Sequence, residues 1–216
     1  MTQYHRARAW KSFKMAVKRG LRLIYLEHLA IALVIVAQRH MPKQRWRYAS
    51  ETAKARPRLA PFCVGYGLDL GFGGDPITPS AIRVDMPQPY TQVGGYPVQL
   101  GGAAEDLQWF RDRTLDFVYS SHLLEDYAEI GPVLREWLRV LKVGGNLVIY
   151  CPDEQRFRAH CAATGQPYNP HHKHADFSLA FVKAALEQLG GVHVIHENPD
   201  VDVYSWELVA QKMRDA

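Results

Sequence analysis

The fold is decided by one stretch of sequence, Gly67-Leu68-Asp69-Leu70-Gly71-Phe72-Gly73-Gly74-Asp75-Pro76-Ile77. An apolar run leads into glycines at positions 71, 73 and 74, which predicts a strand that ends in a tight turn. Glycines at such a turn also let a ligand approach the backbone closely. The spacing differs from the GxGxxG fingerprint of dinucleotide-binding proteins, and Pro76 prevents a long helix from starting at once. The stretch therefore indicates a ligand-binding turn and counts against a nicotinamide-dependent oxidoreductase.

Short apolar runs alternate with helix-like segments from residue 61 to the end of the chain. One helical face runs from Val133 to Leu141, and we expect Gly144-Gly145 to end that helix. A second helix is expected at Ser178–Leu189, ended by Gly190-Gly191. The expected strands are Cys63–Leu70, Ala81–Val84, Pro97–Leu100, Leu115–Ser120, Leu147–Cys151, Val192–His196 and Val203–Ala210. This alternation predicts an α/β fold with an open, mainly parallel sheet that binds ligands at the carboxyl ends of its strands.

The second strand of this series ends in an acid, Asp85, within Arg83-Val84-Asp85-Met86. A carboxylate at that position can accept hydrogen bonds from both hydroxyls of a ribose, because its two oxygens match two adjacent donors. The glycine turn and the acid at a strand end together indicate a ligand that contains adenosine.

Composition and cysteine usage exclude several classes of protein. The chain has 216 residues, of which 47% are hydrophobic and 22% are charged, which is typical of a globular protein rather than a disordered, collagen-like or coiled-coil one. Its three cysteines, Cys63, Cys151 and Cys161, form no CxxC pair and no even framework. A disulfide-linked secreted scaffold is therefore disfavoured, and we expect a reducing, cytoplasmic location.

The first 60 residues form a basic extension. They carry 14 Lys and Arg against Glu27 and Glu51, a balance of +12, whereas residues 61–216 balance at −8, which together give the net charge of +4. The longest uninterrupted apolar part, Leu29–Ala37, is nine residues, well short of the ~20 that span a bilayer. We therefore expect basic N-terminal helices in residues 1–60 beside a separate domain in residues 61–216.

Three partners suit this extension. One expectation is that it packs against the main domain or a second copy of the chain, with its basic side solvated. Alternatively, it lies on an anionic membrane surface, as a peripheral contact at the inner face of the membrane, where each basic residue contributes about 1 kcal/mol. Nucleic acid is less favoured, because the basic residues are not interleaved with an aromatic RNA-stacking motif.

Five segments of the chain resemble segments of class I S-adenosylmethionine-dependent methyltransferases with the small type 11 domain, and they follow one another in the same order. The resemblance covers about residues 61–212, and the block from 115 to 153 is its most specific part. Its form also resembles members found with bacterial surface-polysaccharide biosynthesis. The segments that carry it are Asp69–Gly74, Val84-Asp85, Ala104–Leu107, Leu115–Glu125 and Arg139–Leu147.

This resemblance implies a Rossmann-like, seven-stranded sheet that is mostly parallel, with an antiparallel last strand at Val203–Ala210. It also implies S-adenosylmethionine as the cofactor, bound along the first four strand ends. The side chain of Asp69 and the backbone of Gly71, Phe72 and Gly73 would hold its amino-acid part, and Asp85 would hold its ribose. The other implied contacts are Glu105 and Asp106 near the adenine, and Ser120, Ser121 and His122 near the sulfonium.

Three histidines are candidates for acid–base chemistry. His122 follows the fourth expected strand, where an acceptor would sit, and an imidazole suits a base near neutral pH. Its alternative role is a hydrogen bond to neighbouring backbone. His171 and His174 lie in Asn169–Asp176, a loop that we expect to line the acceptor pocket, with one of these two histidines contacting the substrate or acting as base. A metal site on this loop is disfavoured, because its ligands are too close together for tetrahedral geometry, and Asp176 is expected to cap the helix that follows.

The sequence thus predicts a methyltransferase that moves a methyl group from S-adenosylmethionine to a hydroxyl of a sugar or another small metabolite. The sugar that accepts the methyl group can also be part of a glycan. The alternatives are an RNA or lipid-linked acceptor, which would give the basic extension a binding role. A degenerate, non-catalytic scaffold recruited through that extension is the remaining alternative.

Overall fold

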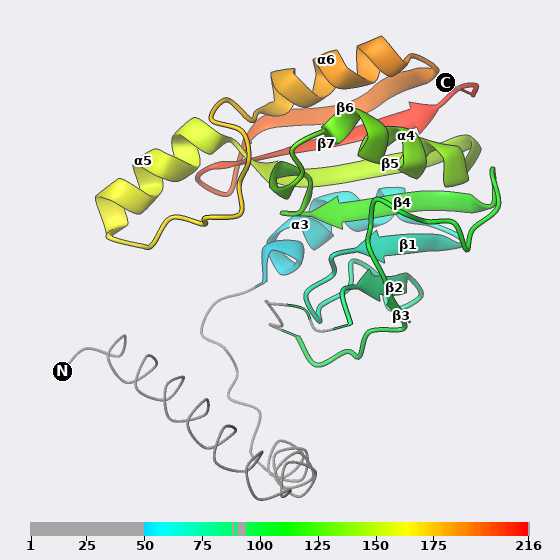
Figure 1. Ribbon diagram of the computed structural model, residues 1–216, viewed down its shortest axis with the longest axis horizontal. Coiled ribbons are helices and arrows are strands. Elements are labelled where there is room, and N and C mark those ends of the chain that lie inside the picture. The colour runs from blue at the N-terminus through cyan, green and yellow to red at the C-terminus, as the bar shows by residue number, and fades with distance from the viewer. Residues whose placement is uncertain (1–49, 88, 90–93, 216) are drawn as a thin grey trace, which may run out of the picture. The chain divides into compact units, whose positions relative to one another are not determined.

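A computed structural model describes residues 50–87, 89 and 94–215. Within these residues, seven strands form one sheet in the order β3-β2-β1-β4-β5-β7-β6 (Figure 1). Their bounds are β1 (Gly67–Leu70), β2 (Ile82–Asp85), β3 (Leu100–Gly101), β4 (Leu115–Ser121), β5 (Leu141–Pro152), β6 (Val192–Val201) and β7 (Ser205–Lys212). The pairs β1–β2, β1–β4, β2–β3 and β4–β5 are parallel, and β7 is antiparallel to β5 and β6. The predicted α/β sheet with an antiparallel last strand is confirmed.

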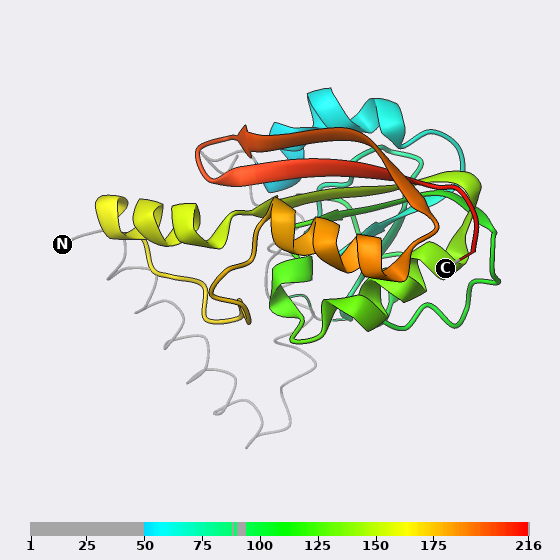
Figure 2. The same ribbon diagram turned by 90° about the horizontal axis from the view of Figure 1, so that it is seen from above.

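Helices lie on both faces of this sheet. Figure 2 shows α3 (Glu51–Leu59) on one face and α4 (Ile130–Val140) and α6 (Leu179–Leu189) on the opposite face. Because side chains alternate along a strand, Phe117 and Tyr119 of β4 pack in the core beneath α3, whereas Val118 packs in the core beneath α4 and α6. Two apolar cores therefore hold the strands flat between the layers and fix where the strands end.

The helix ends agree only in part with the predictions. Gly190, at a φ of 71°, ends α6 as expected. The start of α6 is capped by Ser178, whose side chain accepts a hydrogen bond from the amide of Phe181, so the prediction that Asp176 caps it is wrong. A further helix, α5 (Glu154–Thr164), begins at an Asp153 cap and ends at Gly165.

Gly144 and Gly145 do not end α4, as predicted, but lie inside β5. The helix ends at Val140, and β5 begins at the next residue. The β4–β5 register shifts between Leu115 and Phe117, so extra residues of β5 bulge there. A Cβ on Gly145 would lie 3.1 Å from the carbonyl oxygens of Leu115 and Asp116. The glycines therefore make room for the bulge.

Helix α3 packs against the domain that contains the sheet, although its residues fall in the range predicted for the N-terminal extension. Ala55 and Leu59 are buried in the core on that face. Arg58 forms ion pairs with Asp202 and with the buried Glu207, where its Nε lies 2.7 Å from Oε2. Residues 50–59 are thus part of the same compact unit as the sheet, and residues 1–49 of the predicted extension lie outside the described residues.

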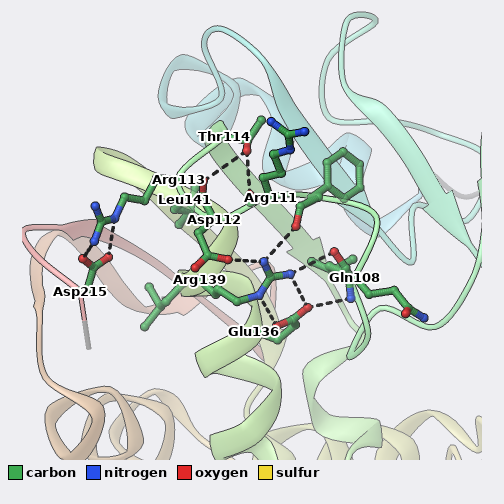
Figure 3. Close-up of polar contacts among 12 residues, drawn as sticks. Gln108, Arg111, Asp112, Arg113, Thr114, Glu136, Arg139, Leu141 and Asp215 are labelled. Carbon is green, nitrogen blue, oxygen red and sulfur yellow. Dashed lines mark hydrogen bonds and ion pairs between the residues drawn. The ribbon is translucent and has the colours of Figure 1, made fainter.

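An arginine of α4 holds the segment between β3 and β4. Figure 3 shows the Arg139 guanidinium among Glu136, Asp112 and backbone carbonyls. It donates to the carbonyls of Leu107 and Phe110 at 3.0 and 2.9 Å, and to Asp112 at 2.6 Å. This segment is therefore tied to α4, and its first residues reach the cavity described below. In the part of the chain that the structure describes, no helix has the length and apolar character to cross a membrane.

Candidate active site

A cavity of about 600 Å³ opens at the carboxyl ends of β1, β2, β3 and β4. This volume falls within the range of small-molecule sites in proteins, about 300 to 1,000 Å³. It is lined by the loops that follow β1, β2, β3 and β4, by the start of α3 and by the loop between α5 and α6. The described residues that line it include Ser50, Glu51, Thr52, Gly71, Phe72, Gly73, Asp85, Met86, Gly102, Ala103, Ala104, Glu105, Ser121, His122, Asp126, Tyr127, Asn169, His171 and Lys173.

The glycine turn after β1 has the backbone conformation that its sequence predicts. Gly71 and Gly73 have φ values of 66° and 58°, which side chains rarely allow. The amide of Gly71 donates to the carbonyl of Val84 at 2.9 Å, which joins the turn to β2. Phe72 is buried and lines the cavity with both glycines. The turn thus presents backbone, rather than bulky side chains, along much of the cavity wall.

Asp85 lies at the end of β2 on the cavity wall, half-buried. Its carboxylate accepts hydrogen bonds from the amides of Gly73 at 3.2 Å and Met86 at 2.8 Å. Burial raises the pKa of Asp85, although the two amides oppose this. Each carboxylate oxygen accepts one of these bonds and has a further lone pair, so the predicted bonds to a ribose are compatible with its position.

The two acids predicted near the adenine lie in different places. Glu105 lines the cavity, and its Oε2 accepts a hydrogen bond from the hydroxyl of Tyr127 at 2.8 Å. Asp106 is not among the lining residues, and its carboxylate binds Gln108. The wall itself is fixed from behind, because Trp137 donates to the carbonyl of Ala104 at 2.7 Å.

Two other predicted cofactor ligands lie behind the cavity wall. Asp69 is fully buried, and its Oδ2 accepts from the amide of Ile77 at 2.6 Å. Burial raises the pKa of Asp69 well above its usual range, which the Ile77 amide only partly offsets. Ser120 is fully buried too, whereas Ser121 lines the cavity. Asp69 therefore holds the glycine turn in shape from inside the protein, and does not line the cavity.

His122 lies where β4 ends and faces the cavity, with a left-handed φ of 49°. Its amide donates to the carbonyl of Tyr150 at 2.9 Å, and its ring packs against the rings of Tyr150 and Tyr204. The Nε2 atom lies 3.4 Å from the hydroxyl of Ser205 and 3.5 Å from Glu51. Burial lowers the pKa of His122 to about 4, against the opposing effect of Glu51. At neutral pH the imidazole is thus uncharged and able to accept a proton.

A buried chain of acids and histidines lies behind His122. Oε1 of Glu125 is 3.8 Å from Nδ1 of His122 and 3.8 Å from Nε2 of His172. His172 in turn contacts Glu154, with Nδ1 2.7 Å from Oε2. Burial raises the pKa of Glu125 to about 8. Burial of Glu154 also opposes its charge, but hydrogen bonds with Tyr168, His172 and Arg158 outweigh this and lower its pKa.

The loop between α5 and α6 lines the cavity as predicted, and of its two candidate histidines it is His171, not His174, that does so. Asn169, His171 and Lys173 line the cavity. His174 points elsewhere, with Nε2 2.8 Å from the carbonyl of Tyr127 and its ring against Phe177 and Phe181. Among the residues described, no three His, Cys, Asp or Glu side chains are grouped to hold a metal ion.

Sequence reasoning missed Glu51, which lines the cavity opposite His122. Glu51 falls within the predicted basic extension, because the residues around it are rich in Lys and Arg. The available signal was the pattern Ser50-Glu51 before a helix-forming segment, since Ser is a preferred N-cap and Ser50 does cap α3. That pattern predicts a helix start, but nothing in it places the helix against the strand ends.

The residues at the cavity fit S-adenosylmethionine. The turn at Gly71–Gly73 leaves room for a ligand beside the backbone, and Asp85 offers the carboxylate that a ribose needs. The charged side chains among the described lining residues are the acids Glu51, Asp85, Glu105 and Asp126 and the base Lys173. This acidic excess suits a ligand with a positively charged sulfonium.

Comparisons with known proteins agree with this fit. Residues 77–149 match the family model described as a methyltransferase domain. None of the curated proteins matches the sequence. Many solved structures share the fold, and three of them are described here.

An S-adenosylmethionine-dependent methyltransferase of Archaeoglobus fulgidus has a TM-score of 0.57 and 20% identity, over 79% of this chain and 97% of that one. One from Thermotoga maritima has a TM-score of 0.56 and 19% identity, over 87% and 99%. The third belongs to the complex of a Haloferax volcanii methyltransferase with the Trm112 activator, with a TM-score of 0.55 and 19% identity, over 74% and 89%.

The sheet order, the antiparallel last strand and the cavity at the first four strand ends agree with the family match. Residues 77–149 therefore belong to a methyltransferase domain, and the chain has the fold of S-adenosylmethionine-dependent methyltransferases.

Proposed function

We propose that this protein transfers the methyl group of S-adenosylmethionine to a hydroxyl of a sugar or another small metabolite, with His122 as the base. The observation that carries the proposal is the position of His122, which lines the same cavity as the glycine turn and Asp85. When bound, the cofactor supplies an electrophilic methyl group on a cationic sulfur. The protein has to align the acceptor with that methyl group and remove the hydroxyl proton.

The size and polarity of the cavity support a small, polar acceptor. A cavity of about 600 Å³ that also holds the cofactor leaves space for a small molecule or the end of a chain. Besides the glycine turn and Asp85, its lining includes the polar side chains of Glu51, Asp126, Asn169, His171 and Lys173, and such groups can form hydrogen bonds with hydroxyls.

The charge of the cavity disfavours a polyanionic acceptor such as RNA. Four acids and one lysine are the charged side chains among its described lining residues, and a nucleic-acid site carries the opposite sign. The same cavity retains a glycine turn, Asp85 and a neutral histidine, which supports an active enzyme over a degenerate scaffold.

A screen of acceptors with a His122 variant tests the proposal. Purified protein is given radiolabelled S-adenosylmethionine with sugars, amines, lipid-linked sugars and RNA. We expect labelled product from a hydroxyl acceptor, and a loss of about 100-fold in kcat for His122→Asn, because general-base catalysis contributes about 10²- to 10⁴-fold. The exposed His193, changed to Asn, is the matched control. Labelling of amines alone, or full activity in His122→Asn, would contradict the proposal.

A membrane or a second copy of the chain remains our proposed partner for the basic N-terminal residues. The test compares flotation with anionic liposomes for the full chain and for residues 48–216, because α3 packs on the sheet and has to be kept. Flotation of the full chain alone supports the membrane. Equal behaviour of both proteins contradicts it.

A further inference from the structure

One carboxylate oxygen in the cavity is buried and makes no hydrogen bond. This atom is Oε2 of Glu51, from the first turn of α3. A buried polar atom without a partner costs about 1 to 3 kcal/mol, so its retention beside a ligand cavity calls for a bound group. The side chain as a whole is 30% exposed, and Glu51 is one of the residues that line the cavity.

The orientation of Glu51 is fixed by its other oxygen. Oε1 accepts a hydrogen bond from Nζ of Lys54 at 2.7 Å and one from the hydroxyl of Tyr204 at 3.4 Å. Tyr204 is itself packed edge-on against the ring of His122. The carboxylate is therefore held at one oxygen, and its second oxygen is presented beside His122.

Oε2 of Glu51 and Nε2 of His122 lie 3.5 Å apart, and in the neutral tautomer with the proton on Nδ1 both atoms are hydrogen-bond acceptors. This distance is longer than a hydrogen bond between them. Both residues line the same cavity. The pair can thus receive two donor groups side by side, one on each atom, when the donors sit on adjacent carbon atoms.

We propose that Glu51 and His122 together recognise an acceptor with two neighbouring donor groups, a vicinal diol or an amino alcohol, and that Glu51 binds the group that is not methylated. This inference rests on the proposed function, because it takes His122 as the base. It narrows the acceptor class to molecules with adjacent donors, and it assigns a substrate-binding role to Glu51.

The same placement balances the charges of the transfer. The acceptor oxygen forms its bond to the methyl carbon, and its proton moves to Nε2 of His122. The carbon–sulfur bond breaks with its electron pair left on sulfur, which becomes a neutral thioether. One positive charge therefore moves from the sulfur to His122, where the Glu51 carboxylate faces it at 3.5 Å. The other groups around this ring are Lys54, Glu125, His172, Asp202 and Ser205.

Binding of small probes tests this inference before any natural acceptor is known. Protein saturated with S-adenosylhomocysteine is titrated with ethylene glycol, ethanolamine and ethanol, and the His122 ring signals are followed by NMR. We expect both two-donor probes to bind more tightly than ethanol. Glu51→Gln should weaken the two-donor probes about tenfold, leave ethanol unchanged, and keep S-adenosylhomocysteine affinity within about twofold. The exposed Glu187, changed to Gln, should behave as wild type.

Three results would overturn the inference. They are equal affinity for ethanol and ethylene glycol, an unchanged affinity of Glu51→Gln for the two-donor probes, or no change of the His122 ring signals with either two-donor probe. Failure of the proposed function is a separate result, seen as full methyl transfer by His122→Asn. With an acceptor from the screen, Glu51→Gln should raise KM at least tenfold for diols and leave the KM of single-hydroxyl acceptors unchanged.

Discussion

Glu125 is a carboxyl that the fold keeps uncharged. It is 1% exposed and sits between His122 and His172, with Asp126, Cys151 and Glu154 as its other titratable neighbours. Burial raises its pKa to about 8 from the usual 4.5. The unfolded chain therefore releases this proton at a lower pH than the folded protein, so the free energy of unfolding falls as pH rises from about 4.5 to 8.

Replacing Glu125 by Gln should remove this loss, because an amide has the same shape and no proton to release. We expect Glu125→Gln to gain stability relative to wild type as pH rises from 5 to 8, by up to about 1.4 kcal/mol per pH unit. Below pH 4.5 the difference should become constant. Chemical denaturation across this range measures it, with Glu187→Gln as the control. A difference that does not change between pH 5 and 8 would refute the buried, neutral carboxyl.

Asp85 is the residue on which cofactor affinity should depend most. Two hydrogen bonds to a ribose, each worth about 0.5 to 1.5 kcal/mol or more when charged, predict that Asp85→Ala weakens S-adenosylhomocysteine binding at least about tenfold. The exposed Asp176, changed to Ala, should have no effect. Calorimetry distinguishes these outcomes, and a wild-type dissociation constant for Asp85→Ala would remove the ribose assignment.

Among the secondary-structure elements, helix α3 fixes the position of Glu51 in the cavity wall. Its Ser50 and Arg56 both bind Asp75 beside the glycine turn, and its Arg58 binds Asp202 and Glu207 at the far strands. These contacts hold the helix to two parts of the sheet. Because Glu51 lies in its first turn, they also place the carboxylate that faces His122.

Loss of the Arg58 contacts should destabilise the protein measurably. Glu207 is 1% exposed, and without Arg58 its carboxylate retains the hydrogen bond with Nε2 of His196 at 2.9 Å. Arg58 is about a third exposed, so solvent screens part of the effect, and we expect Arg58→Met to cost about 1 to 3 kcal/mol. Arg135→Met, on an exposed site of α4, should change stability by less than about 0.5 kcal/mol. Equal stability of the two variants would show that α3 is held by its apolar contacts alone.

The strand positions could be predicted from the sequence because each strand is an apolar run that ends at a polar or glycine residue. Where two signals competed, the prediction was less accurate. Gly144-Gly145 has the form of a helix end, but the strand pairing required a bulge there. The sequence of α5 carries no apolar stripe, since Glu154 and Cys161 are its buried residues, and its signals were the Asp153 cap and Gly165.

At the scale of the whole molecule, the site is built from segments that are far apart in the chain. The glycine turn and Asp85 were predictable, because both follow directly from strand ends. Glu51, Asn169, His171 and Lys173 reach the cavity through packing of α3 and of the α5–α6 loop, which no local pattern encodes. The same packing turns His174 toward Tyr127 and places Asp69 behind the turn. Sequence thus predicts the lining residues at the strand ends better than those that α3 and the α5–α6 loop contribute.

Calorimetric titration of the purified full chain with S-adenosylmethionine, S-adenosylhomocysteine and NAD tests most directly whether the cavity binds S-adenosylmethionine. A site formed by the glycine turn, Asp85 and an acidic cavity predicts one-to-one binding of the first two ligands and no binding of NAD. Binding of NAD, or of none of the three, would contradict the assignment of this cavity to S-adenosylmethionine.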